Sequence, residues 1–432
     1  MEIIIQDSLK DLQHNDFTNL ANRLSSISQL LNSELALPKT TQISQILQCC
    51  PNNTSIESIR LYRGLLLIIR NLAPKLTQDD LFIQAITSYI QFNKLDIVES
   101  DWKTKTEVVY WQILANFPRN EIVTQVNDLF NQIQYDDMFR APIIHFLFRQ
   151  FFTEDIEVTN FKLQQVFKEG NYILEYIHKL YQTIDFNNPD HDCKMLIHLI
   201  YDVITHESFI TWIVHSEGLF KWLELTDTVI QTRDQWNIYE LTALISWNME
   251  VFLAQSKDLT SILQDFDLEQ ILSVNLNILS ELSKFEILKK LLVQYPNFLP
   301  QLISTFHKIH NSIKPITLKS NDKIESVTSY SGVKSSIIII LSHLCHESTD
   351  IQDQIRELGG LALVLSNCII DNNNPFIKEH AIICLKYLLL DNPRNQQVVA
   401  DLEAKQTVDD QVLQEVGYQV DIVDGEVKLK KK

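Results

Sequence analysis

The sequence predicts an all-α protein built as an armadillo-like helical-repeat solenoid, and three observations support this class. Glycine and proline are scarce, with 8 Gly and 11 Pro in 432 residues, so few turns of the kind that β-sandwiches need are available. Helical periodicity of apolar residues runs through almost the whole chain. Similar residue frames also recur 44 and 45 residues apart, which matches one repeat of about 40 to 47 residues.

The clearest single helix is expected at 58–72. Leu61, Leu65, Ile68 and Leu72 form one apolar stripe, and three arginines fall mostly outside it. A lone helix has nothing to bury this stripe against, so it needs a neighbour on each side. A stack of similar repeats supplies those neighbours.

Candidate groove residues lie near the ends of four predicted helices. Asn71 and Asn116 occupy similar frames 45 residues apart, and His343 and Tyr387 occupy the same frame 44 residues apart. In armadillo-like repeats an asparagine at this place faces the concave groove, so we expect these four side chains to contact a partner. Because His and Tyr replace Asn at two of the four places, an unbroken amide ladder that clamps any peptide backbone is disfavoured.

The stretch 118–310 predicts helices without a clean repeat register. Helix boundaries are expected at four prolines, and the aromatic-rich run 139–152 is expected to fill core; the prolines are Pro142, Pro189, Pro296 and Pro300. The polar stretch 311–331 then predicts a long loop that acts as a hinge. Its serines, Thr328 and Tyr330 could carry regulatory phosphate, although a solvated linker is the preferred interpretation.

Two further repeats are expected after this loop. Gly359-Gly360 predicts the end of one helix, and an apolar helix is expected at 361–370. The turn Asp371-Asn372-Asn373-Asn374-Pro375 leads into a helix at 376–390, with Asn374 as N-cap and Pro375 in the first helical position. Asn392-Pro393 repeats this device. Asp371, Asn372, Asn373 and Asn374 are also candidate contacts on an exposed turn, although capping alone would explain them.

Near the end of the chain the helical periodicity gives way to an alternation of apolar and polar residues. Tyr418, Val420 and Ile422 alternate with polar residues before Asp424-Gly425, and Val427 and Leu429 alternate after it, which predicts a short β-hairpin. A lone hairpin is marginal in water, so it must dock on the last helices or stay mobile. The lysine-rich residues 428–432 are read as a solvated tail rather than a membrane or nuclear-import signal.

Composition restricts the partners and the compartment. The formal net charge is −18, which disfavours nucleic acid and anionic membranes as partners. The six cysteines form no Cys-x-x-Cys pair, and the start lacks the features of a signal peptide. The longest apolar runs are too short to cross a bilayer. We therefore expect a soluble cytoplasmic protein that does not insert into membranes.

No catalytic or cofactor motif is present in the sequence. Histidine pairs such as 307/310 and 343/346 supply two ligands each, whereas a zinc site needs three or four, so packed or solvated histidines are the preferred interpretation. A phosphate-binding glycine loop and the usual hydrolase motifs are missing too. We expect no enzyme activity, no cofactor and no metal. An enzyme would require acids and histidines from distant repeats to converge.

The C-terminal repeats resemble the C-terminal domain of the ataxin-10 family. The resemblance is carried by Arg356-Glu357-Leu358-Gly359-Gly360, by the run from Asp371 to Ala381, and by Asn392-Pro393-Arg394-Asn395-Gln396. It implies a cytoplasmic protein that is involved in cytokinesis and acts through protein partners. Some fungal members carry a copper-related name, but with 4 Met and no Cys-x-x-Cys the soft ligands for Cu(I) are missing here.

These observations predict four segments: an N-terminal armadillo-like array at 1–310, a polar loop at 311–331, ataxin-10-like repeats at 332–405 and a tail at 406–432. The expected function is a non-enzymatic protein-interaction scaffold, because a stacked array offers an extended concave surface. The alternative is an acidic solenoid adaptor that carries basic protein cargo. Steep salt dependence of binding would favour the adaptor.

Overall fold

A computed structural model of the chain describes most of its residues. They are 2–32, 40–51, 54–76, 79–97, 100–118, 123–151, 156–185, 191–214, 216–233, 235–257, 266–316, 329–405, 415, 417–423 and 426–431. The described residues form two compact units, 1–208 and 209–432, and each is built from short helices. The predicted fold class is confirmed: each unit stacks its helices as an armadillo-like solenoid does.

Unit 1 contains eleven α-helices and two 3₁₀ helices among its described residues. In chain order they are α1 (Glu2–Gln13), α2 (Phe17–Asn32), α3 (Thr40–Gln48), α4 (Ile56–Leu72), η1 (Ala73–Lys75), α5 (Asp79–Asn93), α6 (Ser100–Asn116), α7 (Val123–Gln132), η2 (Asp137–Phe139), α8 (Arg140–Phe151), α9 (Ile156–Glu169), α10 (Asn171–Tyr181) and α11 (His191–Ile204). The helix predicted at 58–72 is confirmed as α4.

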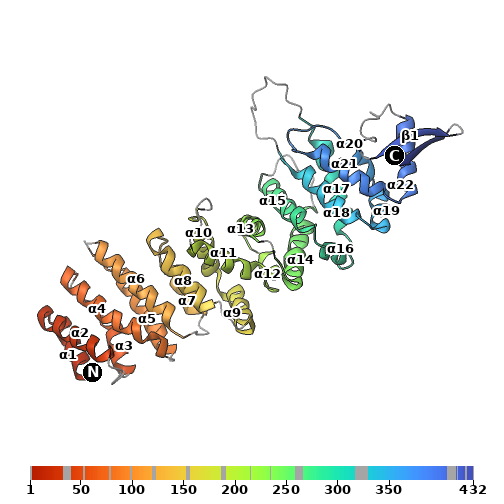
Figure 1. Cartoon of the computed structure of the whole chain (residues 1–432). Helices are drawn as coiled ribbons and strands as arrows, with labels where there is room; N and C mark the ends of the chain where they lie inside the picture. Colours follow the sequence, from red (N-terminus) through yellow and green to blue (C-terminus); the bar gives the residue numbers. More distant parts are fainter. Residues whose placement is uncertain are drawn as a thin grey trace. The chain divides into compact units, whose positions relative to one another are not determined.

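The helices of unit 1 pack in two rows. Helices α2, α4, α6, α8 and α11 pack in that order in one row, and α3, α5, α7 and α10 form the other (Figure 1). Each helix thus finds the neighbours that its apolar stripe requires. Aromatic side chains fill the space between the rows, and the Tyr62 hydroxyl lies 2.6 Å from the Tyr110 hydroxyl in this core. The aromatic run contributes core as predicted, since Phe139, Phe146 and Phe151 are buried. Phe152 lies outside the described residues.

Unit 2 begins at Phe209. Its described helices are α12 (Phe209–Ile213), α13 (Leu219–Thr232), α14 (Ile238–Gln255), α15 (Phe266–Leu282), α16 (Ile287–Leu291), α17 (Phe298–Ser312), α18 (Val333–Cys345), α19 (Thr349–Glu357), α20 (Gly360–Ser366), α21 (Ile377–Leu389) and α22 (Pro393–Lys405). Helices α13, α15, α18 and α21 pack in sequence as one row. Helix α17 packs against α18 and α20, and α20 packs against α21.

Three of the four predicted proline boundaries fall in the described part of the chain, and all three are confirmed. Pro142 and Pro300 lie in the first turns of α8 and α17, and Pro296 lies in the turn before α17. Pro189 lies outside the described residues, as do residues 317–328 of the predicted loop. Helices from both sides of that loop belong to unit 2, where α17 packs on α18 and α20. The domain division at 311–331 stays a prediction.

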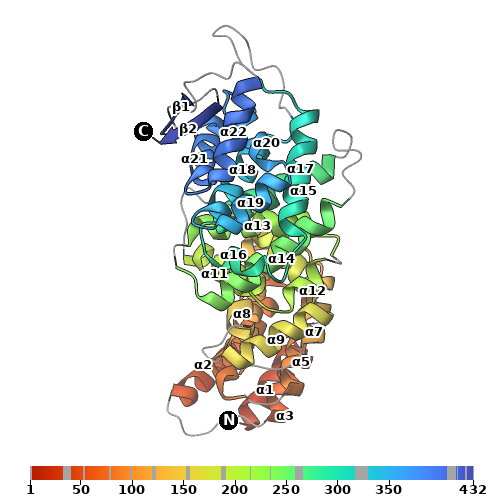
Figure 2. The ribbon, with the colours of Figure 1, turned by 90° about the vertical axis from the view of Figure 1, so that its right-hand side faces the viewer.

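The C-terminal hairpin is confirmed. Strands β1 (Tyr418–Val423) and β2 (Glu426–Lys431) pair antiparallel, with Tyr418 opposite Lys431 and Val423 opposite Glu426. The predicted turn at 424–425 lies outside the described residues. Strand β2 packs on α22 (Figure 2). The buried Tyr418 hydroxyl donates a hydrogen bond to the Leu389 carbonyl at 3.1 Å. The hairpin is therefore docked on the last helices, which was the first of the two predicted alternatives.

Candidate functional site

The sequence predicted candidate contacts in three places: two asparagines in unit 1, and in unit 2 a His/Tyr pair and a polar turn. The structure places each group on a different part of its unit. Asn116 lines a groove, and Asn71 accepts hydrogen bonds from Arg70 of the same lining. The His/Tyr pair packs between helix ends, and the turn joins the start of α18.

Asn71 and Asn116 meet around one arginine. The Oδ1 atom of exposed Asn71 accepts hydrogen bonds from Arg70 Nε at 3.2 Å and Nη2 at 3.0 Å. The Nδ2 atom of half-buried Asn116 donates to the Arg70 carbonyl at 3.3 Å, and its Oδ1 accepts from Arg149 Nη1 at 2.6 Å. Arg70 Nη1 also donates to Gln112 Oε1 at 3.1 Å. The recurring residue frame therefore identified two members, Asn71 and Asn116, of one polar cluster that joins α4, α6 and α8.

This cluster borders an open groove of about 580 Å³. Its polar lining comes from Arg70 of α4, Gln112 and Asn116 of α6, and His145 and Arg149 of α8. The apolar lining is Val108, Ala115, Ala141 and Pro142. The α6 and α8 residues recur at helical spacing, so each helix turns one face to the groove. We refer to this site as the unit 1 groove.

Sequence reasoning missed four polar residues of the unit 1 groove: Arg70, Gln112, His145 and Arg149. The available signal was the spacing of four residues between Gln112 and Asn116 and again between His145 and Arg149, which puts each pair on one helical face. The second pair lies in 118–310, where the repeat register could not be read. Outside the lining, His145 Nε2 lies 3.4 Å from an Asp192 carboxylate oxygen.

His343 and Tyr387 lie near the C-terminal ends of α18 and α21, and both are half-buried. His343 Nδ1 is 2.6 Å from the Ser283 hydroxyl, whereas the Tyr387 ring packs edge-on against His346 with centroids 4.5 Å apart. Burial lowers the pKa of His343; Glu281 opposes this effect and His346 adds to it. The two side chains have structural partners, and their role in partner contact stays a prediction.

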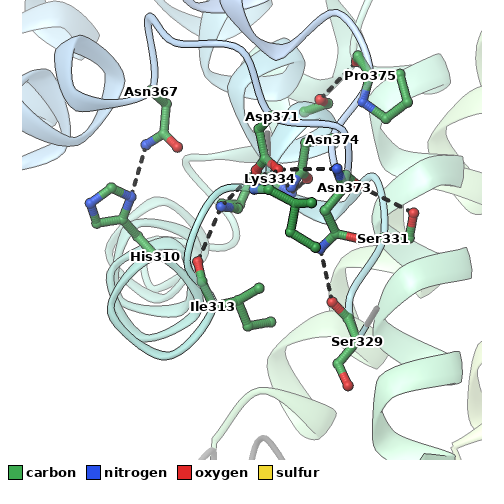
Figure 3. A network of polar contacts seen from close by, with 12 residues as sticks. His310, Ile313, Ser329, Ser331, Lys334, Asn367, Asp371, Asn373, Asn374 and Pro375 are labelled. Atoms are coloured by element: carbon green, nitrogen blue, oxygen red, sulfur yellow. Dashed lines mark hydrogen bonds and ion pairs between the residues drawn. The ribbon is translucent and has the colours of Figure 1, made fainter. Parts of the chain in front are cut away.

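The exposed turn predicted at 371–374 is wrong for three of its four residues. Asn372 is exposed, but Asp371, Asn373 and Asn374 are buried. The Asp371 carboxylate accepts hydrogen bonds from the Ile316 and Asn373 N–H groups and pairs with buried Lys334 at 3.0 Å (Figure 3). Sequence reasoning missed this ion pair, because its members are 37 residues apart (371 minus 334).

Hydrogen bonding to Asp371 outweighs the cost of burying its charge. Burial alone raises the pKa of this carboxyl, but the hydrogen bonds from Ile316, Lys334 and Asn374 lower it by more than burial raises it. The pKa of Asp371 therefore lies below its ordinary value. The carboxylate therefore stays ionised beside the Lys334 ammonium. Such an arrangement fixes the turn in place and leaves little of it accessible to a partner.

Asn374 caps a helix, but not the one that was predicted. Its Oδ1 accepts the Lys334 backbone N–H at 3.0 Å, in the first turn of α18 (Figure 3). Helix α21 begins at Ile377, after Pro375 and after Phe376 in a left-handed conformation with φ of 59°, so Pro375 does not occupy the first helical position. The second predicted N-cap, at Asn392-Pro393, is confirmed, because Asn392 Oδ1 accepts the Asn395 N–H at the start of α22.

The described part of the chain holds neither a metal-ligand cluster nor a helix that could span a membrane. No three His, Cys, Asp or Glu side chains there are grouped so that they could hold a metal ion. None of the helices seen combines the length and apolar character needed to cross a bilayer. The structure thus defines a helical-repeat protein with a polar groove in unit 1.

Comparison with known proteins gives the family. Residues 333–430 match the family model described as the spinocerebellar ataxia type 10 protein domain. An ataxin-10 homolog of Candida albicans is 48% identical, over 98% of this chain and 97% of that protein. The chain belongs to the ataxin-10 family.

Other relatives and one solved structure extend the comparison. An ataxin-10 homolog of Debaryomyces hansenii is 38% identical, over 86% of this chain and 80% of its own. Human ataxin-10 is 30% identical over 34% of this chain and 32% of its own. The crystal structure of SYS-1 aligns with 96% of this chain and 84% of its own, at 13% identity and a TM-score of 0.30.

Proposed function

We propose that this protein is a non-enzymatic protein-interaction scaffold that acts in cytokinesis in the cytoplasm. The observation that carries the scaffold role is the unit 1 groove, where three stacked helices present oriented amide and guanidinium groups to solvent. Stacked helical repeats offer extended binding surfaces without catalytic groups. Membership of the ataxin-10 family supports the role in cytokinesis.

The chemistry of the groove supports binding rather than catalysis. Its described lining holds two arginines, one histidine and two amides, but no carboxylate and no Ser, Thr or Cys nucleophile. Covalent catalysis needs such a nucleophile within hydrogen-bond reach of the reacting atoms, and the lining offers His145 alone as a general acid–base group. The lining can therefore recognise a partner through hydrogen bonds and charge.

Affinity capture with a paired variant tests the scaffold role. The bait is the intact chain, beside a variant with Asn71→Ala and Asn116→Ala and a control with Asn297→Ala and Asn311→Ala, whose side chains are exposed in unit 2. We expect specific partners with the intact chain and the control, and at least about tenfold less with the groove variant. Equal recovery with all three would refute the groove as the contact surface. No specific partner with the intact chain would refute the scaffold.

Depletion of the protein tests the role in cytokinesis. Cells that lose it should accumulate with duplicated nuclei and incomplete separation, and re-expression of the intact chain should reverse this. Normal separation after complete depletion would contradict this part of the proposal.

The net charge of −18 favours a second candidate function, an adaptor for basic cargo. Its binding should weaken steeply as salt rises, because exposed charges would supply the attraction. The basic lining of the unit 1 groove does not suit such cargo, so an adaptor would have to use another acidic surface.

A further inference from the structure

Helices α16 to α21 form two repeats of three helices each. Helices α16, α17 and α18 make the first and α19, α20 and α21 the second, because α17 packs on α20 and α18 packs on α21. Helix α22 packs on α21 as α19 packs on α18, so it takes the place of the first helix of a third repeat. Among the described residues a β-hairpin follows α22, and no helix lies on α21 as α21 lies on α18. One side of α21 is therefore left exposed.

The exposed side of α21 carries apolar residues. Phe376, which directly precedes the helix, is 72% exposed, and Ile383 is 46% exposed. Half-buried Leu390 directly follows the last helical residue. These three residues are seven apart, which is about two helical turns, so they lie along one side of the helix, away from the buried Ala381 and Cys384. We refer to this side as the outer face of α21.

Neither backbone preference nor packing explains the phenylalanine at position 376. Positive φ is strained for residues other than glycine, and among those asparagine tolerates it best. Five described non-glycine residues have positive φ, of which Asn15, Glu347 and Asp391 are polar and exposed and Tyr330 is fully buried. The fifth, Phe376, combines φ of 59° with an apolar side chain that is mostly exposed. An apolar side chain that the fold does not need at a strained position points to a contact outside the chain.

The turn before α21 holds Phe376 in its exposed position. Asp371 and Asn374 of this turn are buried, and their side chains bond to Lys334 at the start of α18. The apolar residues that flank them, Ile370 and Phe376, are 66% and 72% exposed. Apolar residues are more often buried than polar ones, so this turn reverses the common distribution. A side chain that is already fixed in place loses little conformational entropy when a partner covers it.

Charged residues border the outer face of α21. Ile383 lies between Glu379, one turn before it, and Lys386, one turn after it, and both charged residues are exposed. The Lys386 ammonium makes no ion pair with any residue that the structure describes, whereas Lys378 is matched by Glu415 at 3.5 Å. A partner with an acidic residue beside its apolar stripe would complement this border.

We propose that the outer face of α21 binds an amphipathic helix of a partner protein, which takes the place on α21 that α21 takes on α18. The apolar stripe of the partner helix packs on Phe376, Ile383 and Leu390, and an Asp or Glu one turn from the stripe pairs with Lys386. Helices α18 and α21 have 13 residues each, so a partner helix of about 13 residues, about 20 Å long, fits this place. This second surface extends the proposed scaffold function and does not depend on the unit 1 groove.

Fluorescence anisotropy with defined peptides tests the assignment. The stripe peptide is a labelled alanine-based helix of about 16 residues, stapled on its polar face because isolated helices of this length are marginal in water. It carries an apolar stripe of Leu and a Glu one turn after the central Leu. One matched peptide has Lys in place of that Glu, and another has the same Leu residues distributed around the helix. We expect the stripe peptide to bind the full chain and the redistributed peptide to bind at least about tenfold more weakly. Equal binding of these two peptides, or no binding of the stripe peptide up to about 1 mM, would overturn the proposal.

Three variants test the residues. Phe376→Asn should weaken stripe-peptide binding at least about tenfold and leave the melting temperature unchanged or higher, because Asn adopts positive φ more readily. Phe266→Asn is the matched control: Phe266 is 68% exposed at the first position of α15, and affinity should stay within about twofold. Lys386→Glu should reverse the charge preference, so that the Lys peptide binds more tightly than the stripe peptide. Equal losses for Phe376→Asn and Phe266→Asn, or an unchanged preference with Lys386→Glu, would refute this site.

Folding and other occupants are tested separately. Thermal unfolding by circular dichroism shows whether each variant is folded, and Ile383→Ala, which should also weaken binding, keeps the test decisive if Phe376→Asn is not. A dimer of the intact chain that the Phe376→Asn chain does not form, measured by sedimentation, would mean that a second copy covers this face. Binding of phosphatidylcholine vesicles by the intact chain but not by Phe376→Asn would mean that a membrane covers it. Either result overturns the proposal.

Capture of cellular partners separates this inference from the scaffold function. If the intact chain captures specific partners but does not bind the stripe peptide, the helix-binding assignment is refuted and the scaffold stands. If the stripe peptide binds but the intact chain captures no partner, the scaffold is refuted and the helix-binding surface stands.

Discussion

Removing the Asp371 carboxylate should destabilise unit 2 more than any surface change. Asp371 and Lys334 have side chains that are 1% and 0% exposed, and their charged atoms lie 3.0 Å apart. In an Asp371→Ala variant the buried Lys334 ammonium keeps only the Ile313 carbonyl, at 3.3 Å, among its described partners. Neutralising or hydrating that ammonium then costs free energy in the folded state.

The expected loss can be worked from the lost partners. Breaking a buried ion pair by removing one member costs about 3–5 kcal/mol. The Ile316 and Asn373 N–H groups and the Asn374 amide lose the same acceptor, and each would cost about 1–3 kcal/mol if water did not replace it. Because water can enter the space that the carboxylate leaves, we expect about 4 kcal/mol. With a urea m-value of about 2 kcal/mol/M, the midpoint should fall by about 2 M.

Urea unfolding followed by circular dichroism measures this loss. Glu286→Ala is the control, because Glu286 is 71% exposed and pairs with Lys289 at the surface, and it should change stability by less than about 0.5 kcal/mol. A double variant, Lys334→Met with Asp371→Asn, removes both charges and keeps an acceptor for the N–H groups. It should lose less than half as much as Asp371→Ala. An Asp371→Ala midpoint within about 0.3 M of the parent would refute the reasoning.

Three other perturbations give expected outcomes. Asn392→Ala should lower the free energy of unfolding by about 1–2 kcal/mol, because Asn392 caps α22 and is 2% exposed, whereas Asn372→Ala should change it little; equal urea midpoints would contradict this. Burial lowers the pKa of His343, so unfolding should take up a proton there and stability should fall as pH drops below about 6.5; His343→Asn should flatten that slope in urea titrations at pH 5.5–7.5. Gly360→Ala should lower the melting temperature, because its Cβ would lie 2.8 Å from Ile355 Cγ2 and 3.1 Å from its carbonyl, and an unchanged value would show that the neighbours can shift.

The sequence predicted the helices wherever local signals agree with packing. Gly359 takes the predicted left-handed conformation, with φ of 81°, between α19 and α20, and α21 begins one residue after its predicted start. Helix α20 ends at Ser366 rather than Ile370. There the chain turns toward Asp371, and the buried polar partners of that turn decide the boundary rather than the propensity of its isoleucines.

Long-range side-chain partners could not be predicted. The bond from Arg149 to Asn116 spans 33 residues and the one from Asn374 to Lys334 spans 40, and each depends on which helices become neighbours. Between 118 and 310 the sequence gives helices without a register, so no pairing of α6 with α8 followed from it. Asn71 and Asn116 were found because they share a repeat frame, whereas Arg149 lies where no repeat frame could be identified and was missed.

Burial separates the two polar clusters by role. The cluster around Asp371 is buried, and its amides, carboxylate and ammonium are matched to one another, with Asn374 capping α18 from 40 residues away. Since a buried polar group must be satisfied, these residues are explained once the fold is given. The cluster around Arg70 is open to solvent and holds the Arg70 guanidinium against the neutral amide oxygens of Asn71 and Gln112. Folding does not require cations there, so that cluster is the better place to look for a partner, even though the family resemblance is strongest at the other one.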